Sequence, residues 1–176
     1  MSILPRTLAE VETHFPRSVA ILVIGYMTAP FRDWNSIIEA GEYETCLDAL
    51  DALDINIDLC LNNAARHGCV EMVQLMIDKG AEDLAGGLIS ACAGGHVDAA
   101  KLMMKKGASA WDWGLFRASY NGHIPTAQLM LAAGAKNTPE CIRVARLNGH
   151  DKTVRYLQKV LEGGPIDLSD QEATAR

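Results

Sequence analysis

A motif of one large apolar residue, one alanine and one glycine recurs every 27 residues along this 176-residue chain. In chain order the recurring residues are Leu61, Ala64 and Gly68; Leu88, Ala91 and Gly95; Leu115, Ala118 and Gly122; and Ile142, Ala145 and Gly149. Gly-Ala pairs close three of the units at the same interval. Chance does not hold so many columns in register. A fixed period of this length indicates a repeat protein, so each residue is interpreted by its place in the unit.

Each unit is predicted to form two short helices separated by a tight turn. In the second half of a unit, apolar residues recur at helical spacing and form a broad stripe that has to be buried. One such set is Val97, Ala100, Leu102, Met103 and Met104. Gly95 allows a sharp reversal between the helices, and Gly107 ends the second helix. Because one helix pair cannot bury its own apolar face, neighbouring units must stack, which predicts an all-α solenoid.

The composition agrees with one helical domain. Hydrophobic residues make up 49% of the chain and charged residues 22%, and the aromatic content of 6% favours packed helices over a β-sandwich. The five cysteines form no Cys-x-x-Cys pair, so neither a disulfide framework nor a structural zinc site is supported. They are Cys46, Cys60, Cys69, Cys92 and Cys141. We interpret them as reduced core residues of an intracellular, cytoplasmic protein.

Charge and hydropathy argue against two classes of partner. The formal net charge of −6 disfavours a surface built to neutralise phosphates, so no nucleic-acid partner is predicted. The longest apolar run, residues 19–27, is about half as long as the ~20 residues that a membrane-spanning helix needs. Glu10 and Glu12 precede the run and no Ala-x-Ala site follows it, unlike a signal peptide. We therefore expect no membrane partner.

The order of the recurring columns resembles the ankyrin repeat. The shared pattern is Leu-x-x-Ala-small-x-x-Gly-His followed by Leu-Met-x-x-Gly-Ala, and residues 88–108 and 115–135 match it best. The resemblance covers residues 34–161 and implies a helix-turn-helix solenoid of about four to five stacked repeats with degenerate caps. The period is shorter than the ankyrin value of about 33 residues, which implies units without the usual β-hairpin. Such short units look like the ankyrin-like repeats of large DNA viruses, for which the location would be the host cytoplasm.

The chain is predicted to have three segments. Residues 1–32 form an N-terminal cap segment, residues 33–161 the ankyrin-like repeat domain, and residues 162–176 a disordered tail. Trp34 and Gly41 occupy recurring columns, so a degenerate first unit is expected around them.

Residues 1–32 are also faintly similar to an F-box, a module that docks a ubiquitin-ligase adaptor. The similarity depends on Leu4-Pro5, Leu8, Val11 and Phe15-Pro16. Arg6 stands where an acidic residue is usual, so a cap is the preferred interpretation of this segment.

The resemblance implies a non-enzymatic protein-protein interaction module that binds through the concave face lined by the first helices. The predicted first helices carry arginines but no lysine, and acids such as Asp58 and Asp112 stand at helix starts, where capping explains them. The arginines predict a partner protein with an acidic surface. Trp111 and Trp113 lie in a predicted connector and are further candidate contacts. The predicted partner-binding residues are Asn63, Arg66, His67, Ser90, Trp111, Trp113, Arg117, Tyr120, Asn121, Arg143 and Asn148.

No catalytic, cofactor or metal site is predicted. His96, His123 and His150 recur with the period, but residues one repeat apart are too distant to share a metal ion. Nothing near Cys92 specifies the base and orienting group of a cysteine nucleophile, and no phosphate-binding glycine loop occurs. Two alternatives to the interaction module stay open, namely a substrate-recruiting adaptor for a ubiquitin ligase and a structural component of a virion. The sequence makes no prediction of the oligomeric state.

Overall fold

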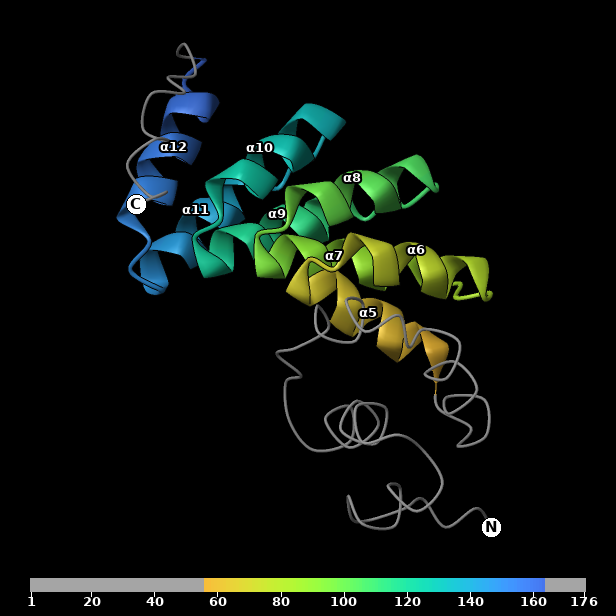
Figure 1. Ribbon diagram of the computed structural model, residues 1–176. Coiled ribbons are helices and arrows are strands. Elements are labelled where there is room, and N and C mark those ends of the chain that lie inside the picture. The colour runs from red at the N-terminus through yellow and green to blue at the C-terminus, as the bar shows by residue number, and fades with distance from the viewer. Residues whose placement is uncertain (1–55, 164–176) are drawn as a thin grey trace, which may run out of the picture.

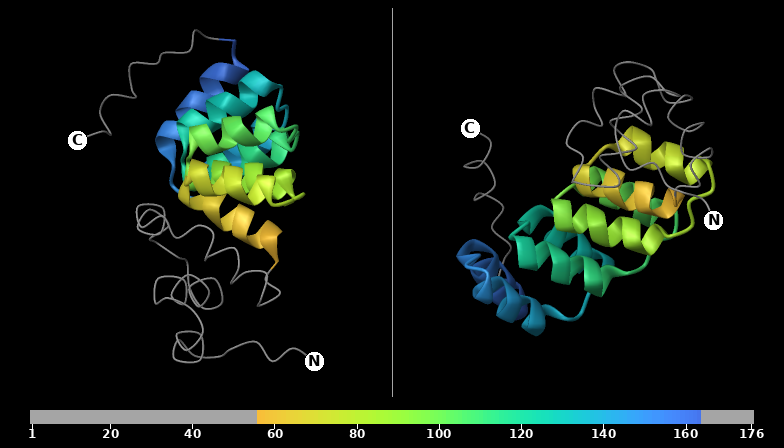
Figure 2. Two further views of the ribbon diagram at one scale, coloured as in Figure 1. Left: turned by 45° about the vertical axis from the view of Figure 1, so that its right-hand side comes forward. Right: turned by 90° about the horizontal axis from the view of Figure 1, so that it is seen from below.

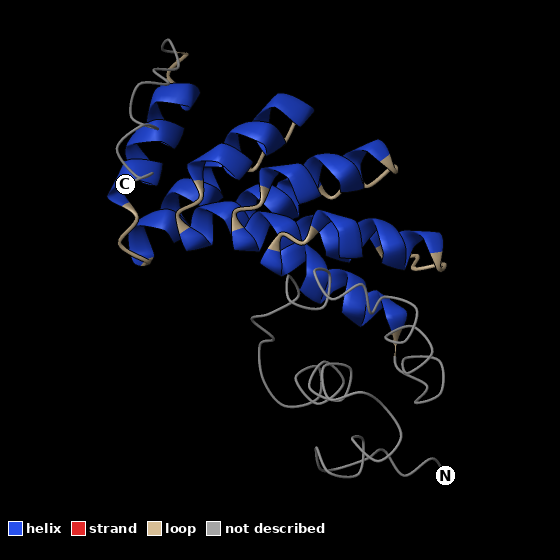
Figure 3. Ribbon diagram, in the orientation of Figure 1, coloured by secondary structure: helices blue, strands red, loops and turns tan. Residues whose placement is uncertain are grey.

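The computed structural model describes residues 56–163, which form eight α-helices joined by short connectors (Figure 1). No strand occurs in this part of the chain (Figure 3), so the all-helical prediction is confirmed for it. The helices are α5 (Ile57–His67), α6 (Val70–Asp78), α7 (Leu84–Gly94), α8 (Val97–Lys105), α9 (Trp111–Asn121), α10 (Ile124–Ala133), α11 (Thr138–Leu147) and α12 (Asp151–Leu161).

The helices are arranged as four antiparallel pairs in two layers. Helices α5, α7, α9 and α11 are the first helices of their units, and α6, α8, α10 and α12 are the second helices. Each first helix packs on the second helix of its own unit and on the first helix of the next unit. Contacts between neighbouring second helices are much sparser, and these helices spread apart like a fan (Figures 1 and 2). The array therefore curves, with the first helices on its inner side.

Small buried residues allow the first helices to approach one another closely. Ala64, Ala91 and Ala118 occupy one column of this layer and expose no surface. Gly94 on α7 shows how tight the packing is, because a Cβ atom there would overlap the backbone carbonyl oxygen of Arg66 on α5. The large, fully buried side chains are one leucine on each of α5, α7 and α9 and one or two methionines or leucines on each second helix. This division of small and large columns places the core between the two layers.

A histidine fastens each unit to the preceding one. Gly122 ends α9 in the left-handed region, at φ 79°, and a Cβ atom there would lie 2.7 Å from His150 Nδ1 of the next unit. The other ring nitrogen, Nε2, lies 2.8 Å from the carbonyl oxygen of Tyr120. His123 and Gly95 repeat the same ring-on-glycine contact one unit earlier. The recurring histidines thus have a structural role at the interfaces between units.

Aspartates in the first turn of two first helices fasten units in a second way. Asp58 Oδ1 accepts hydrogen bonds from the backbone amides of Glu82 and Asp83, at 2.7 and 2.9 Å. Asp112 Oδ1 accepts from the amides of Lys136 and Asn137, at 2.6 and 3.3 Å. The prediction that these two acids cap their own helices is therefore wrong. They hold the connector that leads into the next unit, because its unpaired amides lie within reach of the carboxylate.

The last unit has the features of an end of the stack. Arg146 is exposed in the column where Ala65, Cys92 and Ser119 are buried by the following unit. No atom lies within 4 Å of a Cβ built on Gly149, whereas the corresponding Gly122 meets a histidine. Helix α12 ends at Leu161, the predicted end of the repeat domain. The predicted cap and F-box-like segment at 1–32, the degenerate first unit, and residues 164–176 of the predicted tail lie outside the described residues.

Candidate functional site

Exposed apolar side chains mark the first helices. Leu59 on α5 is 49% exposed, Trp113 and Tyr120 on α9 are 63% and 42% exposed, and Leu147 on α11 is 72% exposed. Within residues 56–163 the only other large hydrophobic residue with comparable exposure is Leu161, at the end of α12. A single exposed apolar residue needs no explanation, but several that gather on one layer indicate a surface made for contact.

The densest group lies on α9 and consists of Trp113, Phe116, Arg117 and Tyr120, which we call the α9 patch. Their spacing of three and four residues places them along one face of the helix. The rings of Trp113 and Phe116 meet edge to face, with centroids 5.9 Å apart. The guanidinium carbon of Arg117 lies 5.7 Å from the centroid of the Tyr120 ring, within range of a cation–π contact. These contacts pre-order the side chains of the patch.

The two tryptophans of the candidate site have different roles. Both were expected in a connector, and that expectation is wrong, because α9 begins at Trp111 and both lie in its first turn. Trp111 is partly buried against the core and lies 3.8 Å from the Cβ position of Gly134 at the end of α10. Trp113, two residues further on, points away from the core. Only Trp113 is available to a partner.

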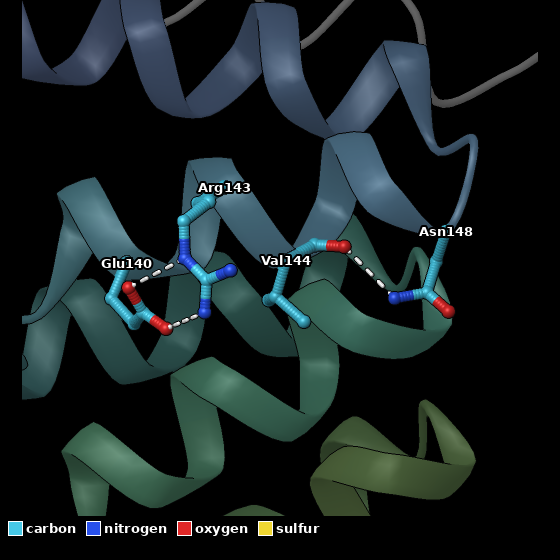
Figure 4. A network of polar contacts seen from close by, with 4 residues as sticks. All are labelled: Glu140, Arg143, Val144 and Asn148. Carbon is cyan, nitrogen blue, oxygen red and sulfur yellow. Dashed lines mark hydrogen bonds and ion pairs between the residues drawn. The ribbon is translucent and has the colours of Figure 1, made fainter.

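The arginines of the first helices differ in how their charge is compensated. Arg143 forms a two-point ion pair with Glu140, in which Nε donates to Oε2 at 3.0 Å and the second bond joins the other nitrogen and oxygen (Figure 4). This pairing holds the pKa of Glu140 below its usual value and raises the pKa of Arg143. Among the described residues, no carboxylate lies within ion-pair distance of Arg66 or Arg117. Arg146 on α11 has no carboxylate partner among these residues either, so uncompensated positive charge lies on α5, α9 and α11.

Two asparagines of the predicted site bond to the protein itself. The Asn121 side chain donates to the carbonyl of Ala93 in the preceding unit at 2.8 Å. The Asn148 side chain donates to the carbonyl of Val144 at the end of its own helix at 2.9 Å (Figure 4). The other predicted polar contacts are partly buried on the first two units; they are Asn63, His67 and Ser90. Asn121 thus stabilises the interface between two units, and Asn148 stabilises the end of α11.

Three apolar members of this layer were missed by the sequence reading. Leu59 stands in the column of Trp113, and Leu147 stands in the column of Tyr120. Phe116 lies within the α9 patch, one helical turn from Trp113 and one from Tyr120. The 27-residue alignment contained a signal for all three, because each stands one or two periods from a residue that was predicted as a contact: Leu59 from Trp113, Leu147 from Tyr120 and Phe116 from Arg143.

Helix α7, which packs against α9, has a different surface. Its residues in the columns of Trp113, Arg117 and Tyr120 are Gly86, Ser90 and Ala93. These side chains extend no further than one atom beyond Cβ. In these three columns the side chains of α9 are therefore larger than those of the neighbouring helix α7.

Burial disfavours the thiolate form of two of the cysteines that the structure describes. Burial raises the pKa of the Cys92 thiol to about 12 and that of Cys141 to about 11. Both thiols are protonated at neutral pH, whereas a nucleophilic cysteine needs a lowered pKa. Within residues 56–163, no three His, Cys, Asp or Glu side chains are grouped as metal ligands. No helix in this region is both long enough and apolar enough to cross a bilayer.

Comparison with protein-family models finds no match to this chain, and comparison with curated proteins finds none either.

Proposed function

We propose that the chain is a non-enzymatic protein-interaction module, an ankyrin-like α-solenoid that binds an acidic partner protein through the face formed by its first helices. One observation carries the proposal. The α9 patch exposes two aromatic side chains around an arginine that has no carboxylate partner among residues 56–163. Tryptophan, tyrosine and arginine are the residue types most enriched among those that dominate binding energy at protein interfaces.

The arrangement of the helices supports the ankyrin-like part of the proposal. Helix pairs repeat with the 27-residue period, and left-handed glycines such as Gly95 and Gly122 end the first helices where the resemblance places them. Tight packing in one layer and spreading in the other agree with a solenoid whose first helices line the inner side.

The physical basis of binding would be pre-organisation. Helices packed on a shared core lose little conformational entropy when a partner binds, which leaves more of the contact energy for affinity. The Trp113–Phe116 and Arg117–Tyr120 contacts restrict the side chains before binding. A positive face also accelerates encounter with an acidic partner and disfavours basic ones.

The test compares partners captured by the full chain and by two double variants. Trp113→Ala/Tyr120→Ala removes the aromatic groups of the α9 patch, whereas Lys159→Ala/Leu161→Ala removes two exposed side chains of α12, a second helix outside the proposed face. We expect the first variant to lose a dominant partner, identified by mass spectrometry, and the second to retain it. Circular dichroism establishes that both keep the helical content. A partner list that is the same for wild type and both variants would overturn the assignment of the binding surface.

A further inference from the structure

The α9 patch has apolar groups at both ends and a positive charge between them. Trp113 and Tyr120 are separated by two turns of α9, or about 10 Å along its axis. Arg117 lies between them, one turn from each, and is partly exposed. The order of the patch along the helix is therefore aromatic, cationic, aromatic.

The positive charge of the patch needs a carboxylate from outside the described residues. Asp112, on the same helix, already accepts two backbone hydrogen bonds from the next connector. Glu140, on the neighbouring helix, is engaged by Arg143. Arg117 lies over the Tyr120 ring and has no ion pair within residues 56–163, so its fork of N–H donors can bind a carboxylate at two points. A cationic ligand would be repelled at this position.

In three of the four columns of the patch the neighbouring helix carries short side chains, and Ile89 stands in the fourth, the column of Phe116. The short residues of α7 are Gly86, Ser90 and Ala93. Beyond α7, in the column of Tyr120, α5 carries Arg66 without a carboxylate partner among residues 56–163. Two helix spacings of 8–10 Å each separate α5 from α9. An acid bound to Arg66 would therefore lie up to about 20 Å from the Tyr120 end of the patch.

From this geometry we propose that the α9 patch recognises a linear acidic peptide segment of the partner, in which a carboxylate lies between two apolar side chains about 10 Å apart. The carboxylate pairs with Arg117, and the apolar side chains pack on Trp113 and Tyr120. A second acid of the same segment pairs with Arg66. This inference rests on the proposed function and adds to it the chemistry of the ligand and its place on the surface.

The experiment selects ligands from a displayed library of random linear peptides, with the full chain as bait. The enriched peptides are then synthesised with a fluorophore, and their binding is measured by fluorescence anisotropy. The chains compared are wild type, Arg117→Gln, Arg117→Glu, Trp113→Ala and the control Arg146→Glu. Arg146 is an exposed arginine of α11 outside the patch, so the control makes the same charge change elsewhere on the layer.

The expected result is enrichment of peptides with an acid flanked by apolar residues. Their affinity should fall at least about tenfold with Arg117→Glu and Trp113→Ala, less with Arg117→Gln, and little with Arg146→Glu. Enriched peptides that lack acids, or whose binding depends on Trp113 but tolerates Arg117→Glu, would overturn this inference and leave the proposed function standing. If no peptide is enriched, this inference fails and the proposed function is still decided by the partner capture described above. If every enriched peptide binds all variants equally, both the inference and the choice of surface fail.

Discussion

The units α7–α8 and α9–α10 share a backbone arrangement and differ in the surfaces that they display. Their buried residues correspond closely, since Leu88 and Leu115, and likewise Met103 and Met130, are fully buried at equivalent positions. On the exposed face, α7 presents short side chains and α9 presents Trp113 and Tyr120. The comparison teaches that this repeat keeps its buried residues constant while its exposed residues change. Buried columns hold the stack together, and exposed columns are free to vary from unit to unit.

The largest expected change in the free energy of unfolding comes from truncating a core leucine, and it shows whether the two units are packed equally well. Leu88→Ala and Leu115→Ala each remove a fully buried side chain, and each should lower the free energy of unfolding by about 2–5 kcal/mol. Urea denaturation followed by circular dichroism measures both. Because the two leucines occupy the same column, the losses should be similar. A loss below about 1 kcal/mol for either variant would show that the units are packed differently.

The glycines that follow the first and the second helix of a unit should differ in their tolerance of alanine. Gly95 and Gly107 both have positive φ, at 81° and 108°, so alanine is strained at either position. Only at Gly95 does the added Cβ also meet a neighbour, His123 Nδ1 at 2.7 Å, whereas Gly107 has open space. We expect Gly107→Ala to cost about 1 kcal/mol and Gly95→Ala about 2–3 kcal/mol.

Thermal unfolding of these two variants provides the measurement, with Gly122→Ala and Gly134→Ala as the matched pair in the next unit. The same order is expected there, because Gly122 meets His150 and Gly134 makes only ordinary contacts with Trp111. Equal costs within either pair would show that the histidine contact does not constrain the interface.

The aspartate that fastens α9–α10 to the next unit is absent from α7–α8. The residue equivalent to Asp112 is Ala85, which is exposed at the start of α7. Asp112→Ala should lower the free energy of unfolding by about 1 kcal/mol because two amides of the connector lose their acceptor. Ala85→Asp should raise the free energy of unfolding by up to about 1 kcal/mol, because its carboxylate supplies a hydrogen-bond acceptor for the amides of Ser109 and Ala110.

Chemical denaturation of both variants tests this pair, and Ala85→Ser is the control for a polar residue that cannot reach as far. If Ala85→Asp and Ala85→Ser stabilise the protein equally, a local effect at the helix start explains the gain, and the contact between units does not.

The smallest effect concerns the pH dependence of the interface between these two units. Burial lowers the pKa of His123, which contacts Gly95 of the preceding unit, and charges on His96 and His150 lower it further, against the opposing effect of the Ala93 carbonyl. The unfolded chain thus binds this proton more readily than the folded chain. The contribution of neutral His123 to stability is complete above the unfolded pKa of about 6.5 and falls as the pH drops toward the folded pKa.

Unfolding curves between pH 7.5 and 5, recorded for wild type and His123→Gln, measure this contribution. The wild type should lose more stability on acidification than the variant does. An equal or smaller loss in the wild type would contradict a neutral His123 at this interface.

Particular residues show why part of the site was predictable and part was not. Arg117 and Tyr120 were recognised because their columns belong to the exposed face of a periodic helix. Trp111 and Trp113 were misplaced because the start of α9 could not be located to within one turn, and residues two apart on a helix face different directions. The Glu140–Arg143 pair has helical i, i+3 spacing, so a correct start for α11 would have revealed it.

The sequence by itself determined the period, the helical composition of each unit, the buried columns and the positions of the left-handed glycines. These features arise from local preferences and from hydrophobic spacing, and a repeated pattern reports them several times over. Only the tertiary structure decided that Asp112 binds the next connector, that Asn121 binds the preceding unit, and that Arg117 keeps an uncompensated charge. The first two contacts join residues about one repeat apart, and whether they form depends on how closely and at what angle the helices pack.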